Sequence, residues 1–192
     1  MKINKDMKKT LATALAVLVA TSLFAQGSED ILKKIETAPH NTVSLKFKEV
    51  RTPATGAAGS VTVEGELLFK PEGYLSMLYT NKEVFIIDGS KMTINRDNKS
   101  NIFDTNKNVM MRGLSHVLLN SFSGTPSKFA EEQDADITAT KEGGDYVVTV
   151  TARKKAARGY SKVIIRYDAS DCSIREMQMD EVTGASTFYS VK

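Results

Sequence analysis

The stretch that decides the fold runs from Val43 to Gly89 and reads VSLKFKEVRTPATGAAGSVTVEGELLFKPEGYLSMLYTNKEVFIIDG. Apolar and polar side chains alternate along it, as in the V-S-L-K-F-K run that begins at Val43. Alternation with a period of two predicts strands that have one face in water and one face in an apolar interior. Lys70-Pro71-Glu72-Gly73 and Asp88-Gly89 are typical turn sequences. The stretch therefore predicts an antiparallel meander of strands.

The first residues have the layout of a secretory signal peptide. Four lysines precede an apolar run from Leu11 to Phe24, and Ala25 is the expected cleavage position. The run has 14 residues, fewer than the roughly 20 that a membrane-spanning helix needs. We predict that residues 1–25 are a cleaved signal peptide and that residues 26–192 form one exported domain.

Charge and cysteine content exclude several classes of protein. Residues 1–25 carry four lysines and one aspartate, so the remaining chain has 22 basic and 22 acidic side chains. A neutral domain gives no reason to expect nucleic acid as a partner. Cys172 is the only cysteine, so no disulfide can form within the chain, and we interpret it as a partly buried thiol at a strand end.

The rest of the chain predicts two helices and a second group of strands. Ser28 is expected to cap a short helix that ends before Pro39, and apolar residues at helical spacing predict an amphipathic helix from Asn106 to Phe122. Gly113 weakens this helix, and Gly124-Thr125-Pro126 is expected to end it. Strands are then predicted over 137–140, 146–152, 160–167, 174–179 and 187–191, which makes α+β the fold class.

Residues that carry catalysis are scarce. The sequence has no phosphate-binding glycine loop, no metal-type Cys/His spacing and no nucleophile elbow. Asp134, Asp136, Asp168 and Asp171 fall in turns, where aspartate is favoured because it bonds its own backbone. His116 is expected at the surface of the second helix. We therefore expect that the protein is not an enzyme and that it needs no cofactor and no metal.

The apolar faces of the strands are the candidate binding surface. Two short helices are a small cover for a strongly curved sheet, so part of its dry face is expected to meet a ligand instead. The alternative is that these residues form an ordinary core. The predicted acyl-chain-binding residues are Leu45, Phe47, Val63, Leu67, Phe69, Leu75, Met77, Phe85, Ile87, Met92 and Ile94. The predicted lid residues, on the second helix, are Met110, Met111, Leu114 and Leu118.

The runs VSLKFKEVR, VEGELLFKPEGYL and VFIIDGSKM resemble the first half of LolA, the periplasmic lipoprotein carrier family of Gram-negative bacteria. The order of signal peptide, short helix, amphipathic strands, turn, hairpin and helical insertion is also similar. The resemblance implies a strongly curved, incomplete antiparallel β-barrel that is closed by a short helical lid. The family often has an arginine beside the turn proline that ties the barrel to the lid. Here Lys70 occupies that position and would be the lid latch.

The resemblance also implies a function. It implies a monomeric periplasmic chaperone that takes acylated lipoproteins from an inner-membrane releasing transporter and hands them to an outer-membrane acceptor. Two alternatives remain open: a periplasmic shuttle for lipids or glycolipids, and a regulatory domain that senses lipoproteins. An exported hydrolase is a third and weaker alternative, because the chain lacks a nucleophile–base pair.

Overall fold

The computed structural model describes residues 27–54, 59–154 and 159–192. A helix over residues 27–37 comes first. The strands and helices that follow are β1 (Val43–Thr52), β2 (Val61–Lys70), β3 (Tyr74–Tyr79), β4 (Val84–Asp88), β5 (Lys91–Arg96), β6 (Lys99–Asp104), α2 (Val109–Phe122), α3 (Pro126–Glu132), β7 (Ala135–Glu142), β8 (Asp145–Ala152), β9 (Tyr160–Asp168), β10 (Ile174–Glu181) and β11 (Ser186–Val191). The predicted signal peptide lies outside the described residues.

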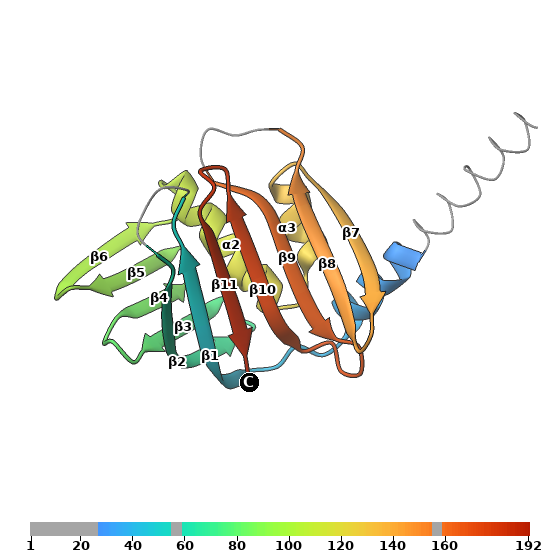
Figure 1. The fold of residues 1–192 in the computed structure, drawn as a ribbon, viewed down its shortest axis with the longest axis horizontal. Coiled ribbons are helices and arrows are strands. Elements are labelled where there is room, and N and C mark those ends of the chain that lie inside the picture. The colour runs from blue at the N-terminus through green and yellow to red at the C-terminus, as the bar shows by residue number, and fades with distance from the viewer. Residues whose placement is uncertain (1–26, 55–58, 155–158) are drawn as a thin grey trace, which may run out of the picture.

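All eleven strands belong to one antiparallel sheet in the order β6-β5-β4-β3-β2-β1-β11-β10-β9-β8-β7. The first strand, β1, lies in the middle of the sheet, and from it the chain runs outward to β6, crosses over through α2 and α3, and returns from β7 to the middle (Figure 1). There β11 pairs with β1, with Lys48 opposite Ser190. The sheet curves strongly, but its edge strands β6 and β7 are not paired with each other. The expected α+β class and the incomplete barrel are therefore confirmed.

Side-chain alternation places the core on the concave face. Phe47, Leu67, Met77, Val148 and Ile165 point inward and are buried, whereas the residues between them are mostly more exposed. Both helices α2 and α3 lie against this concave face (Figure 1). The buried residues of the two halves of the sheet and of the helices form one continuous cluster.

Helix α2 is fixed more firmly at its end than at its start. Asn108 caps the start, where its side chain accepts a hydrogen bond from Met111 N. Near the end, the Tyr167 hydroxyl donates to the Ser121 carbonyl over 2.9 Å, and both residues are buried. The Phe122 ring lies 5.7 Å from the Phe69 ring, centroid to centroid.

The predicted end of the second helix is confirmed, because α2 ends at Phe122, just before Gly124-Thr125-Pro126. Other details differ from the prediction. Pro126 starts a further helix, α3, a place that proline tolerates because the first helical N–H has no partner within the helix. Strand β6 was not predicted, because its residues are almost all exposed and show no apolar alternation. Ser28 lies inside the first helix, and its hydroxyl accepts a hydrogen bond from Ala139 N of the edge strand β7 over 2.7 Å.

The turn prediction is confirmed for Asp168 and Asp171, which accept hydrogen bonds from backbone N–H groups two residues on, but not for Asp136, which lies in β7 opposite Thr151. Gly143-Gly144 forms the two-residue loop of the β7–β8 hairpin. The β4–β5 hairpin forms as well, although its loop is Gly89-Ser90, one residue later than expected. Turn-forming residues in the local sequence therefore predict the positions of these turns to within one residue.

Candidate ligand cavity on the concave face

A cavity of about 760 Å³ lies between the start of α2, helix α3 and the inner face of β8 and β9. Its apolar lining includes Met110, Phe129, Val150, Val163 and the ring of Tyr160. Ligand sites usually measure roughly 300–1,000 Å³ and are mostly apolar. The cavity has the size and lining of a small-molecule site.

Small residues create this space. Ala135 and Ala152 stand opposite each other on β7 and β8, and both line the cavity. Gly113 lines it from α2, and a Cβ at that position would meet no atom within 4 Å. A glycine inside a helix is destabilising by roughly 1 kcal/mol relative to alanine, so Gly113 leaves the cavity open at some cost to the helix.

The predicted acyl-chain-binding residues are brought together, but mostly in a packed core. The residues of this set that are buried in the core cluster are Phe47, Val63, Leu67, Phe69, Leu75, Met77, Phe85, Ile87 and Met92. They lie on the same inner face as the buried half of α2, whose Val117, Leu118 and Phe122 belong to the same cluster. Leu45 and Ile94 are partly buried against it. Their role in binding acyl chains stays a prediction.

The predicted lid residues divide into an exposed and a buried group. Met110 is 52% exposed and lines the cavity, whereas Leu118 is 1% exposed and belongs to the core. Met111 and Leu114 are partly buried against the core cluster. The start of α2 therefore borders open space, and its second half is part of the packing.

Lys70 lies on the outer face of the sheet. It is exposed at the end of β2, and its ammonium group lies 5.2 Å from the centroid of the Tyr74 ring. Helix α2 packs on the opposite, concave face. The predicted role of Lys70 as a latch therefore has no supporting contact with α2 among the described residues.

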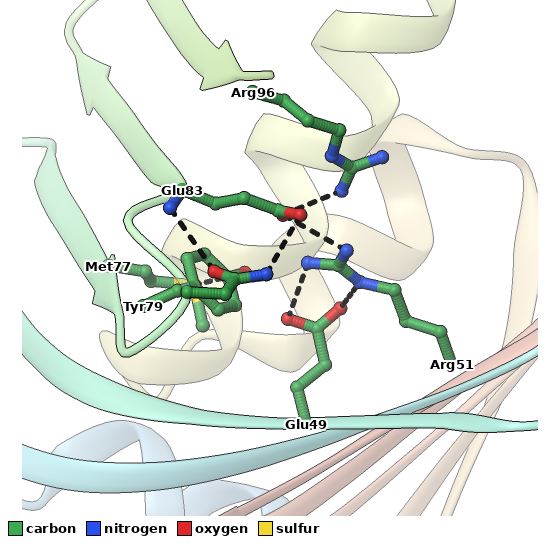
Figure 2. A network of polar contacts seen from close by, with 7 residues as sticks. Glu49, Arg51, Met77, Tyr79, Glu83 and Arg96 are labelled. Carbon is green, nitrogen blue, oxygen red and sulfur yellow. Dashed lines mark hydrogen bonds and ion pairs between the residues drawn. The ribbon is translucent and has the colours of Figure 1, made fainter. Parts of the chain in front are cut away.

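A group of charged side chains lies on the concave face where β1 stops being apolar. The inward positions of β1 continue from Phe47 to Glu49, which is 2% exposed, and to Arg51. Figure 2 shows that the Arg51 guanidinium binds both Glu49 and Glu83. Glu83 Oε2 accepts from Arg51 Nη1 over 3.1 Å and from Arg96 Nη2 over 2.9 Å. We call Glu49, Arg51, Glu83 and Arg96 the polar cluster.

The polar cluster shifts the titration of its members. Desolvation acts to lower the pKa of Arg51, but the hydrogen bond and charge of Glu49 outweigh it, so that the pKa lies above its ordinary value. Desolvation acts to raise the pKa of Glu83, and hydrogen bonds from Arg96 and Arg51 outweigh it, so that the pKa is lowered. Burial and the nearby charge of Glu49 raise the pKa of Tyr79. Arg51 and Glu83 are therefore charged, and Tyr79 is neutral, near pH 7.

The polar cluster lines a second cavity of about 330 Å³, which we call the polar pocket. Tyr160 and Glu181 line both the polar pocket and the 760 Å³ cavity, so the two spaces adjoin. Leu114 and Leu118 of α2 form its apolar side. A third cavity of about 400 Å³ lies at the opposite end of β1 and includes His40, Leu45 and Phe122 in its lining.

The polar cluster was not predicted, although the sequence contains a signal for it. Glu49 and Arg51 fall on the same odd-numbered positions of β1 as Phe47, so strict alternation already places them inside. Because charged residues are almost never fully buried unless they are paired, Glu49 and Arg51 were not expected on the buried face. Glu83 and Arg96 come from a turn and a strand end, and only the folded sheet brings them to Arg51.

Cys172 and His116, the residues considered for nucleophilic or acid–base chemistry, make contacts within the fold. Cys172 is buried, and its thiol lies 3.8 Å from the Lys34 carbonyl. His116 Nδ1 lies 2.7 Å from Glu132 Oε2 and joins α2 to α3. Within residues 27–54, 59–154 and 159–192, no group of three or more His, Cys, Asp or Glu side chains has an arrangement suited to a metal ion. In the same ranges no helix is both long and apolar enough to cross a membrane.

Comparisons with known proteins give similar structures but no similar sequence. No protein-family model matches the chain, and no curated protein matches it. A LolA superfamily protein from Nitrosomonas europaea is 9% identical with a TM-score of 0.42, and the match covers 86% of this chain and 91% of that one. A DUF1329 family protein from Desulfovibrio piger is 12% identical with a TM-score of 0.43, covering 85% and 89%.

A third similar structure is named as an outer membrane lipoprotein-sorting protein domain from Vibrio parahaemolyticus. It is 11% identical with a TM-score of 0.39, and the match covers 88% of this chain and 91% of that one. The chain is thus similar to LolA-like structures over most of its length. With TM-scores below 0.5, these likenesses show nothing about the ligand or partner of this chain.

Proposed function

We propose that this protein binds the acyl chains of a lipid or lipoprotein in the 760 Å³ cavity and carries them through an aqueous compartment. The observation that carries the proposal is the cavity itself, a space with apolar walls and a partly charged lining beside the less firmly fixed start of α2. In this function the N-terminal half of α2 acts as a lid, and the anchored half around Phe122 acts as its hinge.

The energetics set a condition on such a carrier. Burying one chain of ~16 carbons at about 0.8 kcal/mol per CH₂ contributes on the order of 12 kcal/mol before ordering costs. A carrier that kept all of this free energy would not release its cargo. Raising α2 exposes Met111 and Leu114, which are partly buried in the closed state, and so offsets part of the gain.

The route of the carrier is the finer part of the proposal. The signal-like N-terminus and the resemblance to the LolA family favour a periplasmic chaperone that takes lipoproteins from an inner-membrane releasing transporter to an outer-membrane acceptor. The protein performs no catalysis in this function. A periplasmic shuttle for lipids or glycolipids uses the same cavity and differs only in the cargo's head.

Mass spectrometry of organic extracts tests the proposal. Protein purified from the periplasm is expected to release acylated molecules in near-stoichiometric amounts, and the delipidated protein is expected to bind a fluorescent fatty acid. The mass of the head distinguishes an acylated peptide from a glycolipid. An empty protein that also fails to bind the fluorescent fatty acid refutes the carrier function and favours a sensing or structural role.

A further inference from the structure

The polar cluster is an unusual feature of an otherwise apolar concave face. Glu49 is 2% exposed, and the residue two positions before it on the same face is the buried Phe47. Taking two charges out of water carries a desolvation penalty that their attraction often fails to recover, and apolar residues of similar size commonly stabilise a fold as well. Stability alone therefore does not account for charged side chains at this position.

Counting hydrogen bonds shows which groups of the polar pocket remain available. All three side-chain nitrogens of Arg51 already donate hydrogen bonds to Glu49 or Glu83. Both oxygens of Glu83 also accept hydrogen bonds, from Asn81, Arg51 and Arg96. Arg96 makes one of these contacts through Nη2, and a guanidinium carries five N–H donors. Arg96 lines the pocket with a half-exposed side chain, and most of its donors have no protein partner among the described residues.

Two further groups stand where the polar pocket meets the larger cavity. Within the described residues, the Tyr160 hydroxyl makes no hydrogen bond, and burial together with the nearby Glu181 raises its pKa, so the hydroxyl keeps its proton. Glu181 accepts one hydrogen bond, from Thr183 Oγ1 to Oε2 over 3.0 Å. The junction thus offers one neutral hydroxyl and one carboxylate with spare acceptor capacity.

We propose that the polar pocket holds the neutral head of an acylated amphiphile whose tail lies in the adjoining 760 Å³ cavity. The inference rests on the proposed acyl-chain function and adds the chemistry of the head. The charges of the polar cluster cancel, and Glu181 adds one negative charge, so the pocket does not favour an anionic head. A cationic head would gain the single carboxylate of Glu181 but would lie in the same pocket as the Arg96 guanidinium, whose charge is only partly paired.

A head with hydroxyl or amide groups matches the open positions. Such a head accepts hydrogen bonds from Arg96 and Tyr160 and donates one to Glu181. None of these hydrogen bonds needs a net charge on the ligand. Two sources share this chemistry: a sugar on a glycolipid, and the amide of an N-acylated peptide. An anionic head bound by Lys107, Lys154 and Lys162, which line the larger cavity, is the competing arrangement. Lys107 and Lys154 are already paired with Asp104 and Asp134, so that Lys162 is the lysine without a carboxylate partner among the described residues.

Probes that share one dodecyl tail test the inference. Dodecyl glucoside, an N-dodecanoyl amino acid amide, dodecyl phosphate and dodecyltrimethylammonium are titrated below their micelle concentrations against full-length mature protein, by displacement of a fluorescent fatty acid. The glucoside or the amide is expected to bind about tenfold more tightly than both charged probes. The tighter of the two neutral probes identifies the source of the head.

Two variants complete the experiment. Tyr160→Phe is expected to weaken the neutral probes about fivefold and to leave dodecyl phosphate unchanged, because it removes one hydroxyl and keeps the ring. Tyr74→Phe on the outer face is the matched control and is expected to change nothing. Equal binding of all four probes, or tightest binding of a charged probe, overturns the neutral-head pocket while tail binding stands. Failure of every dodecyl probe to bind refutes the acyl-chain function itself.

Discussion

A larger side chain on α2 that fills part of the cavity should weaken ligand binding and at the same time stabilise the protein. Gly113 is helical, its backbone φ is not in the left-handed region, and a Cβ there would meet no atom within 4 Å. Gly113→Leu therefore adds a side chain to a residue that lines the cavity, starting from a Cβ that meets no atom. It is expected to stabilise the free protein by about 0.5–1 kcal/mol through helix propensity alone, and any burial of the leucine side chain adds to this gain.

The same substitution is expected to weaken binding strongly. The four side-chain carbons of leucine take the place of about four CH₂ groups of the cargo, and at ~0.8 kcal/mol each this removes on the order of 3 kcal/mol of burial. Such a loss corresponds to an increase in Kd on the order of 100-fold. Displacement of a fluorescent fatty acid measures Kd, and urea denaturation measures the free energy of unfolding.

Arg112→Leu is the matched control, because it adds the same side chain one position earlier on α2, where the residue does not line the cavity. It is expected to leave Kd within about twofold of the parent protein. If Gly113→Leu stabilises the protein and binds the fatty acid as tightly as the parent does, then the 760 Å³ cavity is not the acyl-chain site. If the cavity is the acyl-chain site, Gly113→Leu raises both Kd and the free energy of unfolding.

Three further predictions concern α2 and one turn. Leu118→Ala is expected to lower the free energy of unfolding by about 2–5 kcal/mol, since Leu118 is 1% exposed, whereas Met110→Ala at a 52% exposed position is expected to change it by less than about 0.5 kcal/mol in urea denaturation. Met111→Asp and Leu114→Asp are each expected to abolish fatty-acid binding while the circular dichroism spectrum stays unchanged, and unchanged binding in both would refute the lid assignment. Hydrogen bonds from the side chain and backbone of its own turn lower the pKa of Asp168 to about 2, so its contribution to stability is complete above the ordinary value of 3.8 and is lost as the pH falls toward 2. The stability difference between the parent protein and Asp168→Asn should therefore shrink in thermal unfolding over that interval, and a difference independent of pH would contradict the assignment.

The sequence predicted the strands because burial on one face leaves a local pattern. Phe47, Leu67 and Met77 alternate with polar residues, and each lies on the concave face as expected. Strand β6 lacks the pattern because an edge hairpin is exposed on both faces. Helix α3 was missed because Pro126 both ends and starts helices, and the local sequence does not say which.

The cavity could not be predicted in the same way. The sequence shows that the concave face is apolar but not how much of it a helix covers, because that depends on where α2 crosses the sheet. In the structure the end of α2 contacts Phe69 of β2 and Tyr167 of β9, while space remains between the start of α2, helix α3 and strands β8 and β9. Gly113 was interpreted only as a weak point of the helix, although its missing side chain is part of the space.

The asymmetry of α2 limits how a carrier of this design can release its cargo. The Tyr167–Ser121 hydrogen bond and the Phe69–Phe122 contact fix the end of the helix, so opening displaces mainly its start. Exposing two half-buried side chains, Met111 and Leu114, costs no more than roughly 3–6 kcal/mol. That is less than the ~12 kcal/mol that a buried 16-carbon chain contributes, so opening the lid into water cannot by itself drive release. Release therefore requires a second apolar environment, a membrane or another acyl-binding protein, that receives the tail as it leaves the cavity.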